Sequence, residues 1–173
     1  MAFQNTVNRM PTYGIQGDVA NGQVPHYTPT TPRVATGATV NCGDFVWIDD
    51  QNGVSTCSKA GTGKPAGIVQ RTMDFPLGVT SEASLTIPAG RTCSVISWGD
   101  VFVKTTNSAS VGQKIFVHNT TGAIKAGNAG SSVSGSTETD FVIVSLANNA
   151  PAAGGSVVIV SNVGASIGYS MAS

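Results

Sequence analysis

The sequence predicts an all-β fold, and three features of its composition support that prediction. Leucine and glutamate, which favour helices, occur only three times and twice in 173 residues. Valine, isoleucine and threonine are abundant, and their stiff side chains suit the pleated surface of a sheet. About ten short runs of such residues are separated by Gly, Asn, Ser and Pro turn signals. This pattern predicts a β-sandwich, jelly-roll or barrel-like body of about ten short strands.

The first 36 residues are expected to form an extended N-terminal arm. Four of the eight prolines lie in this segment, and each removes a backbone donor and biases its predecessor toward extended geometry. Spaced apolar residues, among them Phe3, Tyr13 and Ile15, distinguish the segment from a disordered linker. An arm of this kind needs another surface to lie on, either the body of this protein or a partner.

Residues 37–163 are expected to form the body. The expected strands span residues 45–48, 54–57, 67–70, 84–87, 93–98, 100–105, 114–117, 123–126, 141–147 and 156–161. Asn52-Gly53 predicts a tight hairpin turn between the first two, because both residue types readily take positive φ. Alternation in the strand at 100–105 predicts Val101 and Val103 on one face and Phe102 on the other.

A weak internal repeat joins two of the expected hairpins. Gly43 and Gly53 match Gly112 and Gly122 at the same separation, with an apolar strand after each first glycine. Two interpretations stay open: two related β units packed together, or two hairpins that share turn chemistry independently. Residues 164–173 form a tail of small residues that either frays or docks at a subunit contact.

Charge is scarce, which limits the possible partners. Only 10% of the residues are charged, and nine basic residues balance nine acidic ones. Without a basic patch, nucleic acid is not an expected partner. No apolar run approaches the roughly 20 residues that span a bilayer, so no membrane partner is expected. Residues 141–173 carry no charge, which favours a homo-oligomer, either a dimer or a trimer.

The cysteines are expected to be reduced and buried. Cys42, Cys57 and Cys93 are odd in number and irregular in spacing, unlike a disulfide framework. Their spacing also fits no zinc-binding pattern. Reduced thiols agree with assembly in a reducing cytoplasm.

The search for catalytic chemistry finds no constellation, so no enzyme, cofactor or metal site is expected. The stretch Gly61–Lys64 is similar to a phosphate-binding loop, but Pro65 stands where Ser or Thr must bind magnesium. His26 and His118 lack the partners of a catalytic triad. Trp47 and Trp98 lie within apolar runs and are expected in the core.

Several short motifs, taken in order, resemble those of phage structural cement proteins. The motifs are Tyr13-Gly14-Ile15-Gln16-Gly17-Asp18-Val19-Ala20-Asn21, Gly43-Asp44-Phe45-Val46-Trp47, Gly63-Lys64-Pro65-Ala66-Gly67-Ile68-Val69-Gln70-Arg71, Leu85-Thr86-Ile87-Pro88-Ala89-Gly90, Gly99-Asp100-Val101-Phe102-Val103-Lys104 and Val111-Gly112-Gln113-Lys114-Ile115-Phe116-Val117 with Asn119-Thr120-Thr121-Gly122-Ala123. The resemblance covers about residues 5–147. It implies a β body that sits as an oligomer on the outer surface of the capsid and reinforces the major capsid protein shell.

The resemblance also implies where the protein is found and which residues touch its neighbours. It implies a virion protein, assembled in the host cytoplasm and located on the outside of the capsid. The expected contact residues belong to the arm and are Phe3, Tyr13, Ile15, Asp18, Val24 and Tyr27. The alternative is a head-fibre or tail-associated β module that binds host-surface glycans, which requires an exposed aromatic patch, for example at Trp98.

Overall fold

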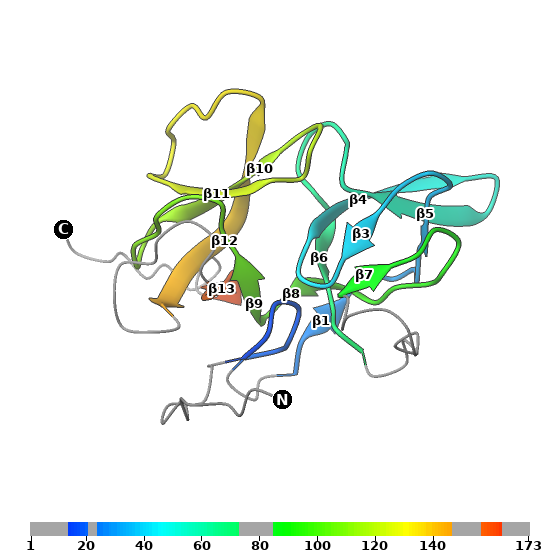
Figure 1. The fold of residues 1–173 in the computed structure, drawn as a ribbon, viewed down its shortest axis with the longest axis horizontal. Coiled ribbons are helices and arrows are strands. Elements are labelled where there is room, and N and C mark those ends of the chain that lie inside the picture. The colour runs from blue at the N-terminus through cyan, green and yellow to red at the C-terminus, as the bar shows by residue number, and fades with distance from the viewer. Residues whose placement is uncertain (1–13, 21–23, 73–84, 147–156, 164–173) are drawn as a thin grey trace, which may run out of the picture.

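The structure is a computed structural model that describes residues 14–20, 24–72, 85–146 and 157–163. The regular structure of these residues is made of strands (Figure 1). The strands are β1 (His26–Tyr27), β2 (Arg33–Val34), β3 (Val40–Asn41), β4 (Phe45–Gln51), β5 (Val54–Ser58), β6 (Gly67–Val69), β7 (Thr86–Ile87), β8 (Val95–Trp98), β9 (Asp100–Lys104), β10 (Lys114–His118), β11 (Ile124–Gly127), β12 (Ser136–Leu146) and β13 (Val157–Ser161). The all-β prediction is therefore confirmed, and a strand forms at each of the ten expected places.

The first lobe consists of a six-stranded sheet and a small two-stranded sheet. The six strands lie in the order β1-β8-β6-β4-β5-β2, and β3 pairs with β7. The β4–β5 hairpin turns at Asn52 and Gly53, whose φ angles of 53° and 76° give the predicted tight turn. β2 runs parallel to β5, and its other side is hydrogen-bonded to the chain that leads into β8.

The second lobe is a five-stranded antiparallel sheet in the order β11-β10-β12-β13-β9. Strand β12 starts at Ser136, five residues before the predicted start. Its first part pairs with β10, and its second part continues beside β13. The first part of β12 was not predicted, because the charged residues Glu138 and Asp140 interrupt the apolar run that indicates a strand.

The two larger sheets share one strand order. In the first lobe the order is β1-β8-β6-β4-β5-β2. In the second lobe the equivalent positions are taken, one by one, by β9-β13-β12-β10-β11 and then by residues 106–107. Thr106 N–H donates to Ile124 O (2.8 Å), and the Asn107 amide exchanges two hydrogen bonds with the Ala126 backbone. Residues 106–107 thereby take the place beside β11 that β2 takes beside β5. Among the described residues, neither sheet closes into a barrel.

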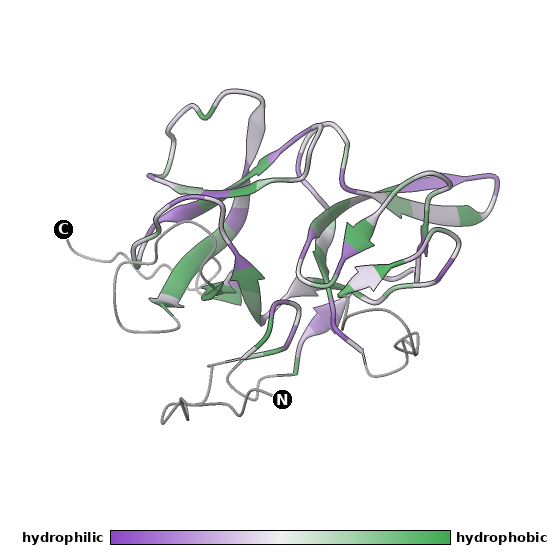
Figure 2. Ribbon diagram, in the orientation of Figure 1, coloured by the Kyte–Doolittle hydropathy of each residue, from purple (hydrophilic) through white to green (hydrophobic). Residues whose placement is uncertain are grey.

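Two apolar clusters hold these sheets together. One contains residues of both lobes, and Phe45 of β4 meets Phe141 of β12 edge to face with ring centroids 5.4 Å apart. The other fills the first lobe and contains all three cysteines. Hydrophobic residues are concentrated along strands such as β9 and the second part of β12 (Figure 2). The lobes therefore share a core and form one body.

The N-terminal segment is more closely joined to the body than its sequence suggests. β1 and β2 both fall within residues 1–36 and belong to the six-stranded sheet. Ala20 and Val34 are buried at 3% and 1% exposure. Because β1, β2 and β3 are only two residues long and depend on distant partners, local sequence patterns did not predict them.

Candidate functional site

Residues 14–20 lie along β9 and extend the five-stranded sheet. Gly17 N–H donates to Phe102 O (2.7 Å), Phe102 N–H donates to Asp18 O (3.0 Å), and Ala20 N–H donates to Asp100 O (2.8 Å). Beneath the segment, Ala20 packs in an apolar cluster with Phe102 and Ile159. The first described residues of the chain are thus fixed to the body by backbone bonds and by apolar contact.

A bidentate ion pair fixes the same segment from its side. Arg71 Nε lies 2.7 Å from Asp18 Oδ1, and Arg71 Nη2 lies 3.2 Å from Asp18 Oδ2. Arg71 N–H also donates to Gly17 O (2.8 Å), and the hydrogen bond to Asp18 raises the pKa of the Arg71 guanidinium. Bidentate arginine–carboxylate pairs define orientation as well as distance, so this pair sets the position of the turn at residues 15–18.

Glycines are required where this turn touches the body. A Cβ on Gly14 would lie 2.4 Å from the Phe102 ring, and one on Gly17 would lie 2.9 Å from the Gly43 nitrogen. Both residues also have positive φ. The Gly-x-x-Gly-Asp motif in residues 14–18 therefore has a structural cause, namely a tight turn seated against a phenyl ring and another backbone.

The surface of this region carries half of the large hydrophobic side chains that are exposed in the described residues. Ile15 is 45% exposed, Val24 80% and Tyr27 45%. Both segments that carry them meet the corner between β8 and β9: Ala20 bonds to Asp100, and Pro25 lies against Gly99. In the ribbon, strand β1 and the segment at residues 14–20 lie on the same side of the molecule (Figure 1). We call Ile15, Val24 and Tyr27 the N-terminal apolar surface.

The expected contact residues differ in their environment. Ile15, Val24 and Tyr27 are exposed, whereas the Asp18 carboxylate is engaged by Arg71 and by Ile15 N–H (3.3 Å). Phe3 and Tyr13 lie outside the described residues. Sequence reasoning missed Arg71 as the partner of Asp18. Both motifs are visible in the sequence, but nothing local shows that they meet.

The aromatic residues at the β1–β8 pair bear on the glycan-binding alternative. Trp98 is half-buried, and the His26 ring lies against it with centroids 4.7 Å apart at a tilt of 40°.

Trp47 is buried, as expected, and its indole N–H donates to Gly63 O (3.0 Å). Gly61–Lys64 thus packs against a core tryptophan, which gives the glycine-rich loop a structural role.

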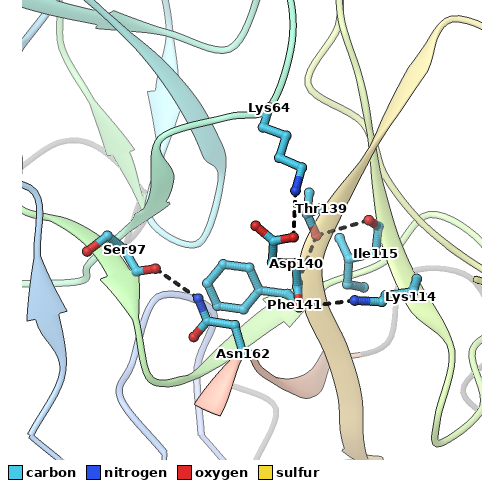
Figure 3. A network of polar contacts seen from close by, with 8 residues as sticks. All are labelled: Lys64, Ser97, Lys114, Ile115, Thr139, Asp140, Phe141 and Asn162. Atoms are coloured by element: carbon cyan, nitrogen blue, oxygen red, sulfur yellow. Dashed lines mark hydrogen bonds and ion pairs between the residues drawn. The ribbon is translucent and has the colours of Figure 1, made fainter. Parts of the chain in front are cut away.

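A polar network joins the two lobes beside Phe141 (Figure 3). Lys64, from the loop before β6, lies 2.6 Å from Asp140 of β12. Its side chain and that of Asp140 are 63% and 61% exposed, so this pair contributes little to stability. Thr139 Oγ1 donates to Ile115 O (3.0 Å) and accepts from Phe141 N–H (3.2 Å), which satisfies the backbone where the pairing of β10 and β12 is irregular.

Asn162 makes the second connection between the lobes. Its Nδ2 donates to Ser97 O (2.9 Å), and its Oδ1 accepts from Gly99 N–H (3.0 Å). The side chain therefore bridges the end of β8 and the start of the turn into β9. The hollow between the lobes at this point is small, about 100 Å³.

The described part of the chain contains no group of three or more His, Cys, Asp or Glu side chains able to hold a metal ion. His118 serves a turn instead, since its Nδ1 accepts from the N–H groups of Thr120 (3.2 Å) and Thr121 (3.3 Å). No helix among the described residues is long and apolar enough to cross a membrane.

Comparisons with known proteins place the chain among capsid proteins. The fold is similar to a chain in the structure "The capsid of Myoviridae Phage XM1", with a TM-score of 0.58 and 21% identity over 94% of this chain and 98% of that chain. No curated protein matches the sequence significantly. The profile of the XM1 gp53 minor capsid protein family matches residues 3–162, nearly the whole chain. The protein therefore belongs to the XM1 gp53 minor capsid protein family, a family of phage capsid-associated structural proteins.

Proposed function

We propose that this protein is a non-enzymatic cement protein, which binds the outer surface of the major capsid protein shell and stabilises it. The observation that carries the proposal is the N-terminal apolar surface on a member of a minor capsid protein family. Phe3, Tyr13, Ile15, Val24 and Tyr27 make the contact in this proposal, and Asp18 holds the turn that presents Ile15.

The way the surface is built supports binding. Burying a large apolar side chain completely contributes about 1.5–3 kcal/mol, and Ile15, Val24 and Tyr27 have about half of their surface or more still to bury. A free arm would lose on the order of 1–2 kcal/mol per residue on ordering. Residues 14–20 are already fixed by the Asp18–Arg71 pair and by backbone hydrogen bonds. Most of their conformational entropy is therefore lost before the protein binds the shell.

Repetition supplies the remaining affinity. When a single copy of the protein binds the shell, Ile15, Val24 and Tyr27 together make only a weak contact. We propose that the protein acts as a dimer or trimer, so that several copies of the surface bind neighbouring capsid subunits together and gain avidity.

The test is co-sedimentation of the purified protein with empty shells of its phage, using a surface variant and a matched control. The surface variant carries Ile15→Ser, Val24→Ser and Tyr27→Ser. The control carries Val54→Ser, Val111→Ser and Val144→Ser, which are 52%, 48% and 43% exposed elsewhere. We expect the surface variant to bind at least about tenfold more weakly than wild type, since it loses more than 1.4 kcal/mol of apolar contact. The control should bind like wild type.

A truncation lacking residues 1–13 completes the design, because it removes Phe3 and Tyr13 and leaves the fixed segment intact. Weaker binding by this variant would assign part of the contact to those residues. Equal binding by wild type and the surface variant would contradict the proposed surface. If the wild type binds no shell but binds host glycans in a screen, the head-fibre or tail alternative replaces the cement role.

A further inference from the structure

Two of the three cysteines are adjacent in the core of the first lobe. Cys57 of β5 and Cys93, two residues before β8, have their sulfur atoms 3.2 Å apart. They are 1% and 2% exposed. We propose that Cys57 and Cys93 are a site of oxidative modification, at which hydrogen peroxide converts the two thiols into an intramolecular disulfide.

The geometry favours this pair. A disulfide brings its sulfurs to about 2.05 Å, so the two atoms need to approach by little more than one ångström. Their backbones lie on opposite sides of β2: Ala35 N–H donates to Cys57 O (2.9 Å), and Cys93 N–H donates to Pro32 O (3.0 Å). The bond would cross β2, so the chains on its two sides would have to move closer together as the bond forms.

The two thiols differ in their readiness to react. The contact with Cys93 lowers the pKa of Cys57, whereas the same contact, together with burial, raises the pKa of Cys93. The Cys93 thiol also donates to Pro32 O (3.7 Å), which holds its proton, so Cys57 is assigned as the thiol that forms the nucleophilic thiolate. Cys57 also lines a hollow of about 440 Å³ with Ala35, Thr56 and Ser58, and this is the side from which hydrogen peroxide would reach the buried sulfur during local opening of the sheet edge.

The reaction has two balanced steps. The Cys57 thiolate attacks one oxygen of hydrogen peroxide, the O–O bond breaks, and Cys57 sulfenic acid forms with hydroxide, which takes up a proton to become water. The Cys93 sulfur then attacks the Cys57 sulfur, the S–O bond breaks, and the departing hydroxyl takes the Cys93 thiol proton and leaves as water. In total, two thiols and one peroxide give one disulfide and two waters.

The bond would change the protein after it leaves the cell. A reducing cytoplasm keeps both thiols reduced during assembly, and the environment outside the cell is oxidising. Closing the loop between residues 57 and 93 restricts the unfolded chain and should raise the melting temperature of this chain by roughly 5–10 °C. The inference does not depend on shell binding, because it concerns the isolated chain.

The decisive measurement is the intact mass of wild-type protein, before and after peroxide treatment, with remaining thiols alkylated under denaturing conditions. Reduced protein should carry three alkyl groups. Oxidised protein should carry one, on Cys42, with a peptide map that links Cys57 to Cys93. Three alkyl groups after peroxide, a sulfinic acid at Cys57 beside a free Cys93, or a link through Cys42 would each overturn the proposal.

Two variants separate the pair from a general effect of peroxide. In Cys93→Val, oxidation should stop at Cys57 sulfenic acid, which dimedone captures. In the control Cys42→Val, which also removes a buried thiol from the same cluster, the link should form as in wild type. Dimedone capture in wild type at the level of Cys93→Val would contradict the role of Cys93 as the second thiol.

Discussion

At the scale of single residues, Gly67 leaves no room for a side chain against the neighbouring backbone. A Cβ there would lie 2.2 Å from Ile96 O, which is backbone of the neighbouring strand β8. We expect Gly67→Ala to lower the free energy of unfolding by about 3 kcal/mol, because β6 and β8 must separate to admit the methyl group. Urea unfolding of the variant and wild type measures this loss.

Gly37→Ala is the matched control. Nothing lies within 4 Å of a Cβ at Gly37, and only its φ of 77° opposes the substitution. The expected loss is therefore about 1–2 kcal/mol. Equal losses in the two variants would mean that β6 and β8 yield easily at Gly67.

Asp44 gives a prediction about pH. Burial raises its pKa, although Asn41 N–H donates to Oδ2 (2.8 Å) and Lys59 Nζ lies 3.7 Å away. The folded protein thus holds the Asp44 proton more tightly than the unfolded chain, and this group favours folding less as pH rises through its raised pKa. Relative to Asp44→Asn, wild type should lose stability as pH rises above about 4, the ordinary pKa of an aspartate.

Urea unfolding of both proteins at a series of rising pH values tests the direction in which their stability difference changes. The Asn side chain keeps an oxygen acceptor for Asn41 and does not ionise, so it isolates the carboxylate. A stability difference that moves in favour of wild type with rising pH would show that attraction to Lys59 exceeds the cost of burying the charge.

At the scale of elements, the segment at residues 14–20 depends on one side chain from outside it. Arg71→Ala removes the bidentate pair with Asp18 but leaves the backbone bonds to β9. We expect a loss of about 0.5–1.5 kcal/mol in global stability, because the pair is about one-third exposed. The amide protons of Gly17 and Ala20 should exchange several-fold faster, as measured by hydrogen exchange.

Lys64→Ala is the matched control for that measurement, since it breaks an ion pair elsewhere. It should leave exchange in residues 17–20 unchanged. If exchange in this segment is the same in Arg71→Ala as in wild type, the backbone bonds alone fix it.

The strands and the segment at residues 14–20 show which features could be predicted from the sequence and which could not. Local signals were sufficient for hairpins such as β4–β5, because Asn52-Gly53 and the strand-forming residues on both sides of it act within a few positions. The alternation in β9 was predicted correctly too: Val101 and Val103 enter the shared core, and Phe102 faces the segment at 14–20. By contrast, Asp18 and Arg71 are 53 positions apart, and only the finished topology brings them together.

At the scale of the whole molecule, the same strand order serves two different purposes. In the first lobe the sheet encloses its own apolar cluster, with β3 and β7 beside it. In the second lobe the sheet shares its core with the first lobe and receives residues 14–20 on its outer side. In the sequence, only the hairpin glycines and the apolar strands beside them indicated a relation between the lobes. Strand order depends on pairings across the chain, which short motifs do not encode.

The covering of the outer strands in the two main sheets has a consequence for aggregation. Residues 17–20 bond to β9, residues 106–107 bond to β11, and the chain before β8 bonds to β2. Three of the four outer strands of the two main sheets therefore have their backbone groups occupied, and the fourth, β1, is two residues long. Open strand edges invite chains to stack into fibrils. A protein without net charge to keep its copies apart gains from this arrangement a protection against aggregation that its charge does not provide.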